Sequence, residues 1–262
     1  MSARLLDTDF ALAYGTGRPI LRGCRLQLER GEILGLIGES GSGKSSCALA
    51  ILGLLGAEAR LSGRIELEGQ NLIGLPEKQL QAIRGRRVGL ILQNPQSALC
   101  PAMTVGQHLE EAWWVHEPQR RREWRQVAEP LFASVGLTLD DALVRLPSRQ
   151  LSVGMAQRVL IAMTLLHQPP LLIADEPTSA LDPIHSAEAA QLLRAVRDEY
   201  GASVLLITHD LPLATAFCDR IAVLSGGEIV ECNRTEQILQ NPRHAYTRQL
   251  LQATRLLHCQ LD

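Results

Sequence analysis

Eight residues near the amino end of the chain have the types and spacing of a phosphate-binding site. Residues 38–45 read GESGSGKS and fill every fixed position of the pattern GxxxxGK[ST]. The three glycines let the backbone wrap around an anion, so that its N–H groups and the start of the next helix face the phosphates. We expect Lys44 to reach the β- and γ-phosphates and the Ser45 hydroxyl to bind Mg²⁺. A glycine-rich turn that binds nothing is the alternative, and the Lys-Ser pair argues against it.

Two carboxylates follow an apolar run in the second half of the chain. Residues 171–174 read LLIA, and Asp175 and Glu176 come directly after them. At the end of a buried strand, Asp175 can hold Mg²⁺ directly or through water, and Glu176 can polarise an attacking water. Such paired acids could instead cap a helix, but a complete phosphate loop upstream favours the catalytic interpretation.

Two further polar residues, Gln93 and His209, each follow a predicted strand. Residues 88–92 read VGLIL and residues 203–208 read SVLLIT. A polar residue at the carboxyl end of a parallel strand can reach a ligand in the crevice there. His209 could therefore contact the γ-phosphate and sense its presence, although a lone histidine is more often structural.

Hydrophobic patterns predict the elements that must position these residues. Continuous apolar runs are typical of central parallel strands, which we expect at 32–37, 88–92, 171–176 and 203–208. Alternation at 20–28 and turn signals within 61–71 predict a small antiparallel sheet. The other predicted elements are helices at 46–52, 75–84, 184–199 and 244–257, an all-helical insertion from 103 to 163, and a hairpin at 221–230.

Composition is that of an ordinary soluble globular protein, with 46% hydrophobic and 21% charged residues. The net charge of −2 gives no electrostatic argument for nucleic acid or an anionic membrane. No apolar run reaches the roughly 18 residues of a transmembrane helix, and residues 1–10 lack a signal-peptide core. We expect a cytosolic protein that can sit on a membrane partner.

Cysteines and aromatic residues give less specific signals. The six cysteines are scattered without a CxxC pair, which favours buried free thiols over disulfides or a metal site. Residues 119–125, QRRREWR, are interpreted as a solvated helix face rather than a nucleic-acid contact. Trp113 and Trp114 cannot both face one core, so we expect one of them to dock on a partner. Tyr14 is either a core residue or a base-stacking one.

In their order and spacing, the motifs resemble those of the ABC-type ATPase cassette. Residues 179–182 read SALD, and residues 151–158 read LSVGMAQR, similar to that family's signature, usually LSGGQ followed by x-Q-R. The resemblance covers essentially the whole chain. It implies an α/β fold: a P-loop NTPase (RecA-like) core with an N-terminal antiparallel β subdomain and an inserted α-helical subdomain.

The resemblance also implies how the chain is divided. We expect a single ABC ATPase domain over 1–262. Its nucleotide-binding α/β core, with the antiparallel β subdomain, would comprise 1–93 and 166–235. The helical subdomain that carries the signature would comprise 94–165, and a C-terminal helical tail would comprise 236–262.

A head-to-tail dimer with two ATP molecules at its interface is a further implication of the resemblance. Tyr14 would stack on adenine, Gln93 would couple the metal site to the helical insertion, Glu176 would be the catalytic base, and His209 would stabilise the γ-phosphate. Asp182 would communicate across the dimer. Residues expected to contact nucleotide are Tyr14, Gly38, Glu39, Ser40, Gly41, Ser42, Gly43, Lys44, Ser45, Ser46, Ser152, Gly154 and Asp182, and those expected at Mg²⁺ are Ser45, Gln93 and Asp175.

The expected partners are a second ABC ATPase subunit in a heterodimer, two transmembrane permease subunits and, indirectly, an external substrate-binding protein. Segments just after Gln93 and in the early insertion would receive a permease helix, with Trp113 and Trp114 as candidates for that surface. The chain would then lie at the cytoplasmic face of the inner (plasma) membrane, with no direct nucleic-acid contact.

Two departures from the signature lead to a hypothesis of unequal sites. Val153 replaces the first signature glycine and Met155 replaces the glutamine, whereas Ser152 and Gly154 are retained. A β-branched residue on unusual backbone would cost on the order of 1 kcal/mol or more. We therefore expect the site that uses this chain's signature to turn over more slowly than the site on its own phosphate loop.

The finer resemblance is to the peptide/nickel importer branch. It is carried by residues 93–99, QNPQSAL, and residues 241–251, NPRHAYTRQLL. The short tail and Met155 look more like the nickel-importing ATPase subunit, so nickel or a metal chelate is the expected substrate and short peptides the alternative. A soluble ABC ATPase that acts on nucleic acid or ribosomes, or a phosphotransferase on the same loop, are disfavoured by the single cassette and the signature.

Overall fold

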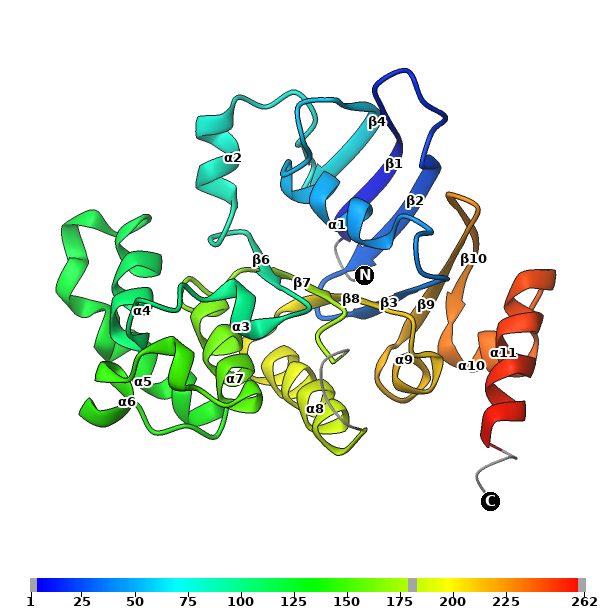
Figure 1. The fold of residues 1–262 in the computed structure, drawn as a ribbon. Helices are drawn as coiled ribbons and strands as arrows, with labels where there is room; N and C mark the ends of the chain where they lie inside the picture. Colours follow the sequence, from blue (N-terminus) through cyan, green and yellow to red (C-terminus); the bar gives the residue numbers. More distant parts are fainter. Residues whose placement is uncertain (1–3, 179–182, 259–262) are drawn as a thin grey trace.

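A computed structural model describes residues 4–178 and 183–258 of the chain. Within these ranges the strands form one ten-stranded sheet in the order β5-β4-β1-β2-β10-β9-β3-β8-β7-β6 (Figure 1). The strands are β1 (Arg4–Tyr14), β2 (Leu21–Glu29), β3 (Ile33–Ile37), β4 (Ala59–Leu67), β5 (Gln70–Asn71), β6 (Val88–Ile91), β7 (Leu171–Asp175), β8 (Ser203–Thr208), β9 (Arg220–Ser225) and β10 (Glu228–Arg234).

Helices occupy the segments between these strands and the end of the described chain. The α-helices are α1 (Lys44–Leu52), α2 (Glu77–Ile83), α3 (Pro95–Ala98), α4 (Val105–Trp114), α5 (Trp124–Ser134), α6 (Asp141–Arg145), α7 (Val153–Thr164), α8 (Pro183–Tyr200), α9 (Leu211–Phe217), α10 (Thr235–Gln240) and α11 (Ala245–His258). Two short 3₁₀ segments are η1 (Pro118–Glu123) and η2 (Ser148–Gln150). None of the helices described is long and apolar enough to cross a membrane.

Four parallel strands, β3, β8, β7 and β6, set the position of the candidate site. In the pairing register, Ile37 at the end of β3 lies beside Thr208 at the end of β8, and Asp175 at the end of β7 lies beside Ile207. Strand β6 pairs with β7 along its whole length. Because these strands run in one direction, the segments that follow all four emerge at the same edge of the sheet.

Each central strand is buried on both faces, which explains its continuous apolar sequence. Along β8, Val204 and Leu206 belong to one core cluster and Leu205 and Ile207 to the other. Helix α1 packs in the second cluster, together with the antiparallel strands, whereas residues of α7, α8 and α9 pack in the first. Figure 1 shows this division, with α1 among the antiparallel strands and α7, α8 and α9 on the other side of the parallel ones.

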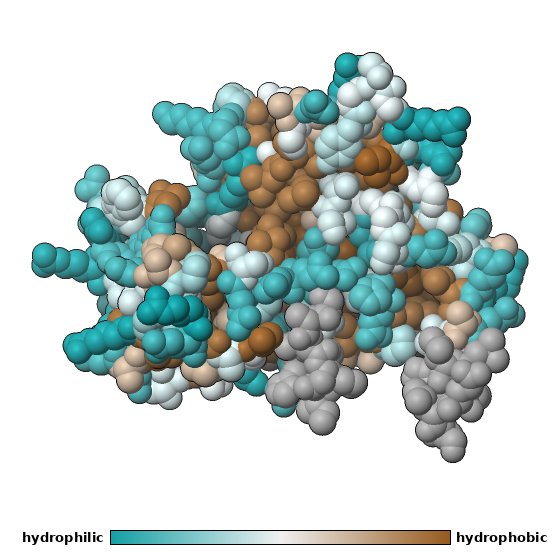
Figure 2. Space-filling view, viewed as in Figure 1, coloured by the Kyte–Doolittle hydropathy of each residue, from teal (hydrophilic) through white to brown (hydrophobic). Residues whose placement is uncertain are grey.

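The expected antiparallel sheet at the amino end is confirmed in β1, β2, β4 and β5. Strand β1 pairs with both β2 and β4, and β5 pairs with β4. The structure adds that this sheet is continuous with the parallel one, because β2 meets β10 at the pair Gly23 and Glu228. Figure 2 shows apolar residues gathered around α1 and the neighbouring antiparallel strands, against a mostly hydrophilic surface elsewhere in this view.

Helices α3 to α7 fill the fully described segment between β6 and β7. The two adjacent tryptophans of α4 face different surroundings, as their spacing requires. Trp113 is buried, its indole N–H donates to the Arg120 carbonyl at 2.9 Å, and its ring stacks on His167. Trp114 is 47% exposed and carries the Arg121 guanidinium over its ring. The tryptophan available to a partner is therefore Trp114.

The cysteines follow the expectation of buried free thiols only in part. Cys24, Cys47 and Cys218 are buried, and the sulfur atoms of Cys24 and Cys47 lie 3.4 Å apart. Cys232 is partly buried, but Cys100 is exposed, so the expectation is wrong for that residue. Cys100 precedes a turn at the surface of the helical segment, where little apolar surface covers it. Cys259 lies outside the described residues.

Candidate functional site

The phosphate loop connects β3 to α1 and needs glycine at defined positions. A Cβ atom at Gly38 would lie 2.3 Å from the Leu224 carbonyl oxygen, which leaves no room for a side chain. Gly41 and Gly43 have φ angles of +80° and +105°, a region that favours glycine. Gly43 is also the residue before α1, and no side chain caps that helix end. The backbone N–H groups at the start of α1 therefore remain available to an anion.

The side chain of Lys44 lies folded back over this loop. It is 5% exposed, and its ammonium donates to the Gly38 carbonyl at 2.8 Å and to the Glu39 carbonyl at 2.9 Å. Burial lowers the pKa of Lys44, and the nearby carboxylates Glu176 and Asp175 oppose the shift. The loop thus holds a cation where the sequence predicts that phosphate oxygens bind.

A second feature of the loop fits an anionic ligand. The hydroxyl oxygen of Ser42 is buried and has no hydrogen-bond partner among the described residues. A buried hydroxyl without a partner is unfavourable by about 1–3 kcal/mol, so a ligand atom that bonds to it would gain affinity. Together with the uncapped start of α1, this hydroxyl makes the loop a suitable cradle for phosphates.

Ser45 and Asp175 form the oxygen pair expected at a magnesium ion. The Ser45 hydroxyl donates to Oδ1 of Asp175 at 3.2 Å. Burial raises the pKa of Asp175, and the hydrogen bond from Ser45 opposes the shift. Among the described residues no cluster of three or more His, Cys, Asp or Glu side chains could hold a metal ion. The Ser45–Asp175 oxygen pair fits Mg²⁺, which usually binds one or two protein oxygens together with substrate phosphates and waters.

Glu176 is the point at which the other candidate residues meet. Its Oε2 accepts from Nδ1 of His209 at 3.1 Å, and the Gln93 amide donates to the same oxygen at 3.5 Å. Its Oε1 lies 4.0 Å from the Lys44 ammonium. The side chain of Glu176 is 16% exposed, so it can still meet water. Residues that follow three other strands thus surround this one carboxylate.

The backbone at Glu176 has an uncommon conformation. Its φ angle is +46°, in the left-handed region that side-chain-bearing residues rarely adopt. Its N–H donates to the Ile207 carbonyl at 2.8 Å. The residue that follows Glu176 is held by α7, because the Gln157 amide donates to the Pro177 carbonyl at 2.6 Å. Sequence reasoning missed Gln157, although its place as the glutamine of x-Q-R in the signature could have pointed to it.

The signature lies at the amino end of α7. The Ser152 hydroxyl accepts from the Met155 N–H at 3.2 Å and so caps this helix. Val153 is the first residue of α7 and has ordinary helical backbone, so the cost considered for an unusual backbone does not arise at this position. A Cβ atom at Gly154 would meet no atom within 4 Å. No hydrogen bond or ion pair joins Ser152 or Gly154 to the phosphate loop within the described residues.

The remaining predicted residues lie at the margin of the site. Tyr14 ends β1, is partly exposed and packs against the core cluster around α1. Ser40 is exposed, and Ser46 is partly buried one residue after Ser45. Asp182 lies outside the described residues. The phenol oxygen of Tyr246 in α11 is buried, and burial, followed by the charge of Glu39, raises the pKa of this tyrosine. Tyr246 therefore lies near Glu39 of the phosphate loop.

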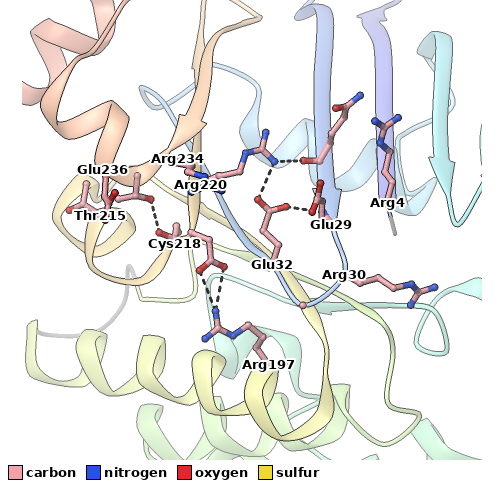
Figure 3. A pocket seen from close by; sticks show the side chains of 14 residues that line it. Arg4, Glu29, Arg30, Glu32, Arg197, Thr215, Cys218, Arg220, Arg234 and Glu236 are labelled. Atoms are coloured by element: carbon pink, nitrogen blue, oxygen red, sulfur yellow. Dashed lines mark hydrogen bonds and ion pairs between the residues drawn. The ribbon is translucent and has the colours of Figure 1, made fainter. Parts of the chain in front are cut away.

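An open pocket of ≈ 810 Å³ lies away from this edge, at the amino end of β3 (Figure 3). Two ion pairs lie among its lining residues. Arg220 lies 3.1 Å from Glu32, and Arg197 lies 3.3 Å from Asp219, whose carboxylate also accepts the Ile33 N–H. These ion pairs tie the turn before β3 to α8 and β9. We assign the pocket a structural role.

The glycine positions lead to a first testable prediction. Gly38→Ala would push a methyl group against the Leu224 carbonyl, so we expect the protein to lose about 1–3 kcal/mol of stability and its affinity for ATP. Thermal unfolding and equilibrium binding of a fluorescent ATP analogue measure the two effects.

Gly154→Ala is the matched control for this substitution. Its added methyl group meets open space, and alanine is favoured over glycine within a helix by about 1 kcal/mol. We expect equal or higher stability and unchanged ATP affinity of the isolated chain. Similar losses in both variants would contradict the steric explanation.

Comparison with known proteins gives a consistent result. Residues 21–179 match the model of a family described as ABC transporter. The chain is 38% identical over 254 residues to the oligopeptide transport ATP-binding protein OppD of Lactococcus lactis subsp. cremoris, covering 97% of this chain and 75% of that protein. It is 40% identical over 255 residues to OppD of Mycobacterium bovis, covering 96% of this chain but only 42% of that protein.

Solved structures agree with the fold. The protein cbiO1 of Clostridium perfringens, described as part of the ABC transporter complex cbiONQ, superposes with a TM-score of 0.79 at 25% identity over 100% of both chains. The ATP-binding cassette MJ0796, in a dimeric structure bound to ADP and phosphate, superposes with a TM-score of 0.71 at 26% identity, covering 89% of this chain and 99% of that one.

Proposed function

The chain belongs to the ABC transporter family, and on that basis we propose that it is the ATP-hydrolysing subunit of an importer. The observation that supports this most directly is the set of contacts around Glu176, which joins Lys44, Gln93 and His209 beside the Ser45–Asp175 pair. A binding module without catalysis would not need a partly exposed carboxylate beside these groups. The reaction would convert ATP and water into ADP and phosphate.

ATP binding would begin with a change at Lys44. The ammonium is held by the Gly38 and Glu39 carbonyls, and it would leave them to bind β- and γ-phosphate oxygens. The exchange replaces two neutral acceptors by charged ones, which form stronger hydrogen bonds with an ammonium. The exposed backbone N–H groups at the start of α1 would bind the remaining phosphate oxygens.

The metal ligands would be the Ser45 hydroxyl and the Asp175 carboxylate. When bound, Mg²⁺ neutralises charge that develops on the phosphate oxygens. The raised pKa of Asp175, which results first from burial, means that this carboxylate gains from a nearby cation. The Ser45 hydroxyl would be the second protein oxygen at the same ion.

Hydrolysis would use Glu176 as the general base. Its carboxylate would accept a proton from the attacking water as the bond between the γ-phosphorus and the bridging oxygen breaks. His209 would orient that carboxylate and contact the γ-phosphate. Gln93 would donate a hydrogen bond to the same carboxylate. Both residues already contact Oε2 of Glu176.

A second ATPase subunit would complete the site. Ser152 and Gly154 lie at the exposed start of α7, and a Cβ at Gly154 would meet open space, so this surface is accessible to a nucleotide bound elsewhere. We propose that it closes over ATP on the phosphate loop of a partner ATPase in a head-to-tail pair. The relative MJ0796 forms a dimer in its ADP-bound structure.

The membrane partners would be permease subunits, which would place the chain at the cytoplasmic face of the membrane. Trp114 and Val115 at the end of α4 are 47% and 63% exposed, which is unusual for large apolar residues. We propose that they contribute to the surface that receives the permease. An external binding protein would act only through that permease.

Short peptides are the substrate class that the comparisons favour. The relatives compared above are named for oligopeptide transport, whereas none of those names mentions nickel. Met155, one basis for the nickel hypothesis, is partly buried and packs against the core cluster, so it has a structural explanation. We therefore propose peptide import, with nickel or a metal chelate as the alternative.

Uptake by the assembled transporter tests this proposal. The chain would be co-expressed with its permease and partner ATPase and reconstituted with the binding protein in vesicles. ATP-dependent uptake of a labelled dipeptide or oligopeptide supports peptide import, whereas uptake of nickel alone supports the alternative. Failure to hydrolyse ATP in the complete assembly would overturn the proposed function itself.

Val153 gives a prediction about the two sites of the assembled pair. Its backbone is unstrained, so any slow step would come from side-chain bulk at the surface that faces the partner's nucleotide. We expect Val153→Gly to raise the steady-state ATPase rate of the transporter severalfold. The same change should lower stability by about 0.3 kcal/mol, because glycine has a slightly lower helix propensity than valine. An unchanged ATPase rate would count against unequal sites.

A further inference from the structure

Gln157 links the signature helix to the segment that follows Glu176. It lies in α7 with 5% of its surface exposed, and its amide donates to the Pro177 carbonyl at 2.6 Å. Its neighbours Ala156 and Val159 are fully buried, so α7 is fixed in the core at this point. The amide therefore holds the Pro177 carbonyl from a rigid support.

The backbone of Glu176 depends on being held from both sides. A left-handed residue other than glycine costs about 1–3 kcal/mol and persists only where its surroundings fix it. The Glu176 N–H donates to the Ile207 carbonyl, which fixes the side toward the sheet. On the side toward α7, the Gln157 amide donates to the Pro177 carbonyl and so holds the residue that follows Glu176.

We propose that Gln157 is a positioning residue that holds the Glu176 carboxylate in place through the Pro177 carbonyl. The inference rests on the proposed function, because it assigns a role relative to the general base. Without this hydrogen bond, Glu176 can relax toward negative φ, and its carboxylate then moves away from His209 and Gln93. A displacement of about 1 Å at a catalytic group can lower a rate by about a hundredfold.

Gln157→Leu tests the role by removing the donor while preserving much of the side-chain volume. In the transporter assembled with its partner subunits, we expect kcat for ATP hydrolysis to fall about 10- to 100-fold. The KM for ATP should stay within twofold of wild type, because the phosphate loop is untouched. A merely structural role would lower stability without this split between kcat and KM.

Gln107→Leu is the matched control. The Gln107 side chain accepts the Thr104 N–H and completes the capping box of α4, so its loss also removes a structural hydrogen bond. We expect this variant to lose some stability and to keep the wild-type kcat. Comparing the two variants separates the general effect of losing a structural hydrogen bond from the specific effect of losing the bond between Gln157 and the Pro177 carbonyl.

Gln157→Glu provides a second readout, which also decides the question if the leucine variant does not fold. A buried glutamic acid has a raised pKa, and only its protonated form can donate to a carbonyl. We expect kcat relative to wild type to rise at least fivefold as the pH falls from 8.5 to 6. The leucine variant should show no such recovery.

The outcomes distinguish this inference from the proposed function. Wild-type kcat in both Gln157 variants, or a glutamate variant without recovery at low pH, would overturn the positioning role. A wild-type assembly that hydrolyses no ATP would instead overturn the proposed function on which the inference rests.

Discussion

Glu176→Gln should lower ATP turnover about a thousandfold, within the range that general bases contribute. The amide keeps the shape of the carboxylate and can still accept from His209 and Gln93, whose contacts lie at 3.1 and 3.5 Å. It cannot accept the proton of the attacking water. ATP affinity should be unchanged, and the pair of ATPase subunits should still close in the presence of ATP. Single-turnover hydrolysis and size-exclusion chromatography with ATP measure these effects.

Glu129→Gln is the control for this change. Glu129 lies in α5 with its side chain 57% exposed and pairs with Arg125 on the same helix. Exposed pairs of this kind contribute about 0.3–0.5 kcal/mol, so turnover should stay at the wild-type rate. Normal hydrolysis in the Glu176 variant would sink the assignment of this residue as the base.

Asp175→Asn should remove activity and raise stability in the same protein. The amide oxygen can still accept from Ser45, but it offers a cation no negative charge. We expect turnover to fall by about 10²–10³, the scale of losing one preorganised electrostatic contact. The nucleotide-free protein should at the same time unfold at a higher temperature at neutral pH, because the buried carboxylate is replaced by a neutral group.

The stability gain has a defined pH dependence. Burial raises the pKa of Asp175 above the ordinary aspartate value of 3.8, despite the hydrogen bond from Ser45. The unfolded chain therefore releases this proton first, and wild-type stability declines as the pH rises from the unfolded pKa through the raised folded pKa. The asparagine variant lacks this decline. Its advantage in melting temperature should be small near pH 3.5 and grow toward neutral pH.

Thermal unfolding in the presence of EDTA checks this dependence without bound metal. Comparing the two proteins at each pH cancels the contributions of all other groups that they share. A variant that is less stable than wild type at pH 7, or an advantage that shrinks as the pH rises, would contradict the assignment of a buried, unfavourable charge. Retained turnover would contradict the metal role.

The sequence alone was sufficient to predict the strands that carry the site. The strands predicted at 32–37, 171–176 and 203–208 correspond to strands that end at Ile37, Asp175 and Thr208 in the structure. These strands are buried on both faces, so their local sequence records their place in the sheet. The phosphate loop was equally predictable, because Gly38 has no room for a side chain and Gly43 has a positive φ angle.

Other features could not be predicted because they depend on contacts between distant segments. The backbone of Glu176 is left-handed although nothing in its residue type favours that conformation. A cost at Val153 depended on an unusual backbone at that position, but Val153 is an ordinary first residue of a helix. Trp113 and Trp114 are identical in type, and the packing of α4 against the core cluster decides that Trp113 is the buried one.

The sequence by itself determined which chemistry this protein has, and the tertiary structure decided how its groups meet. Residue types and spacing identify the phosphate loop, the carboxylate pair, Gln93 and His209, because each is a local pattern. Gln93 and His209 meet at Oε2 of Glu176 because the parallel register of β8, β7 and β6 brings distant strand ends together. The support from Gln157 arises in the same way, since hydrogen bonds across such distances exist only in the folded chain.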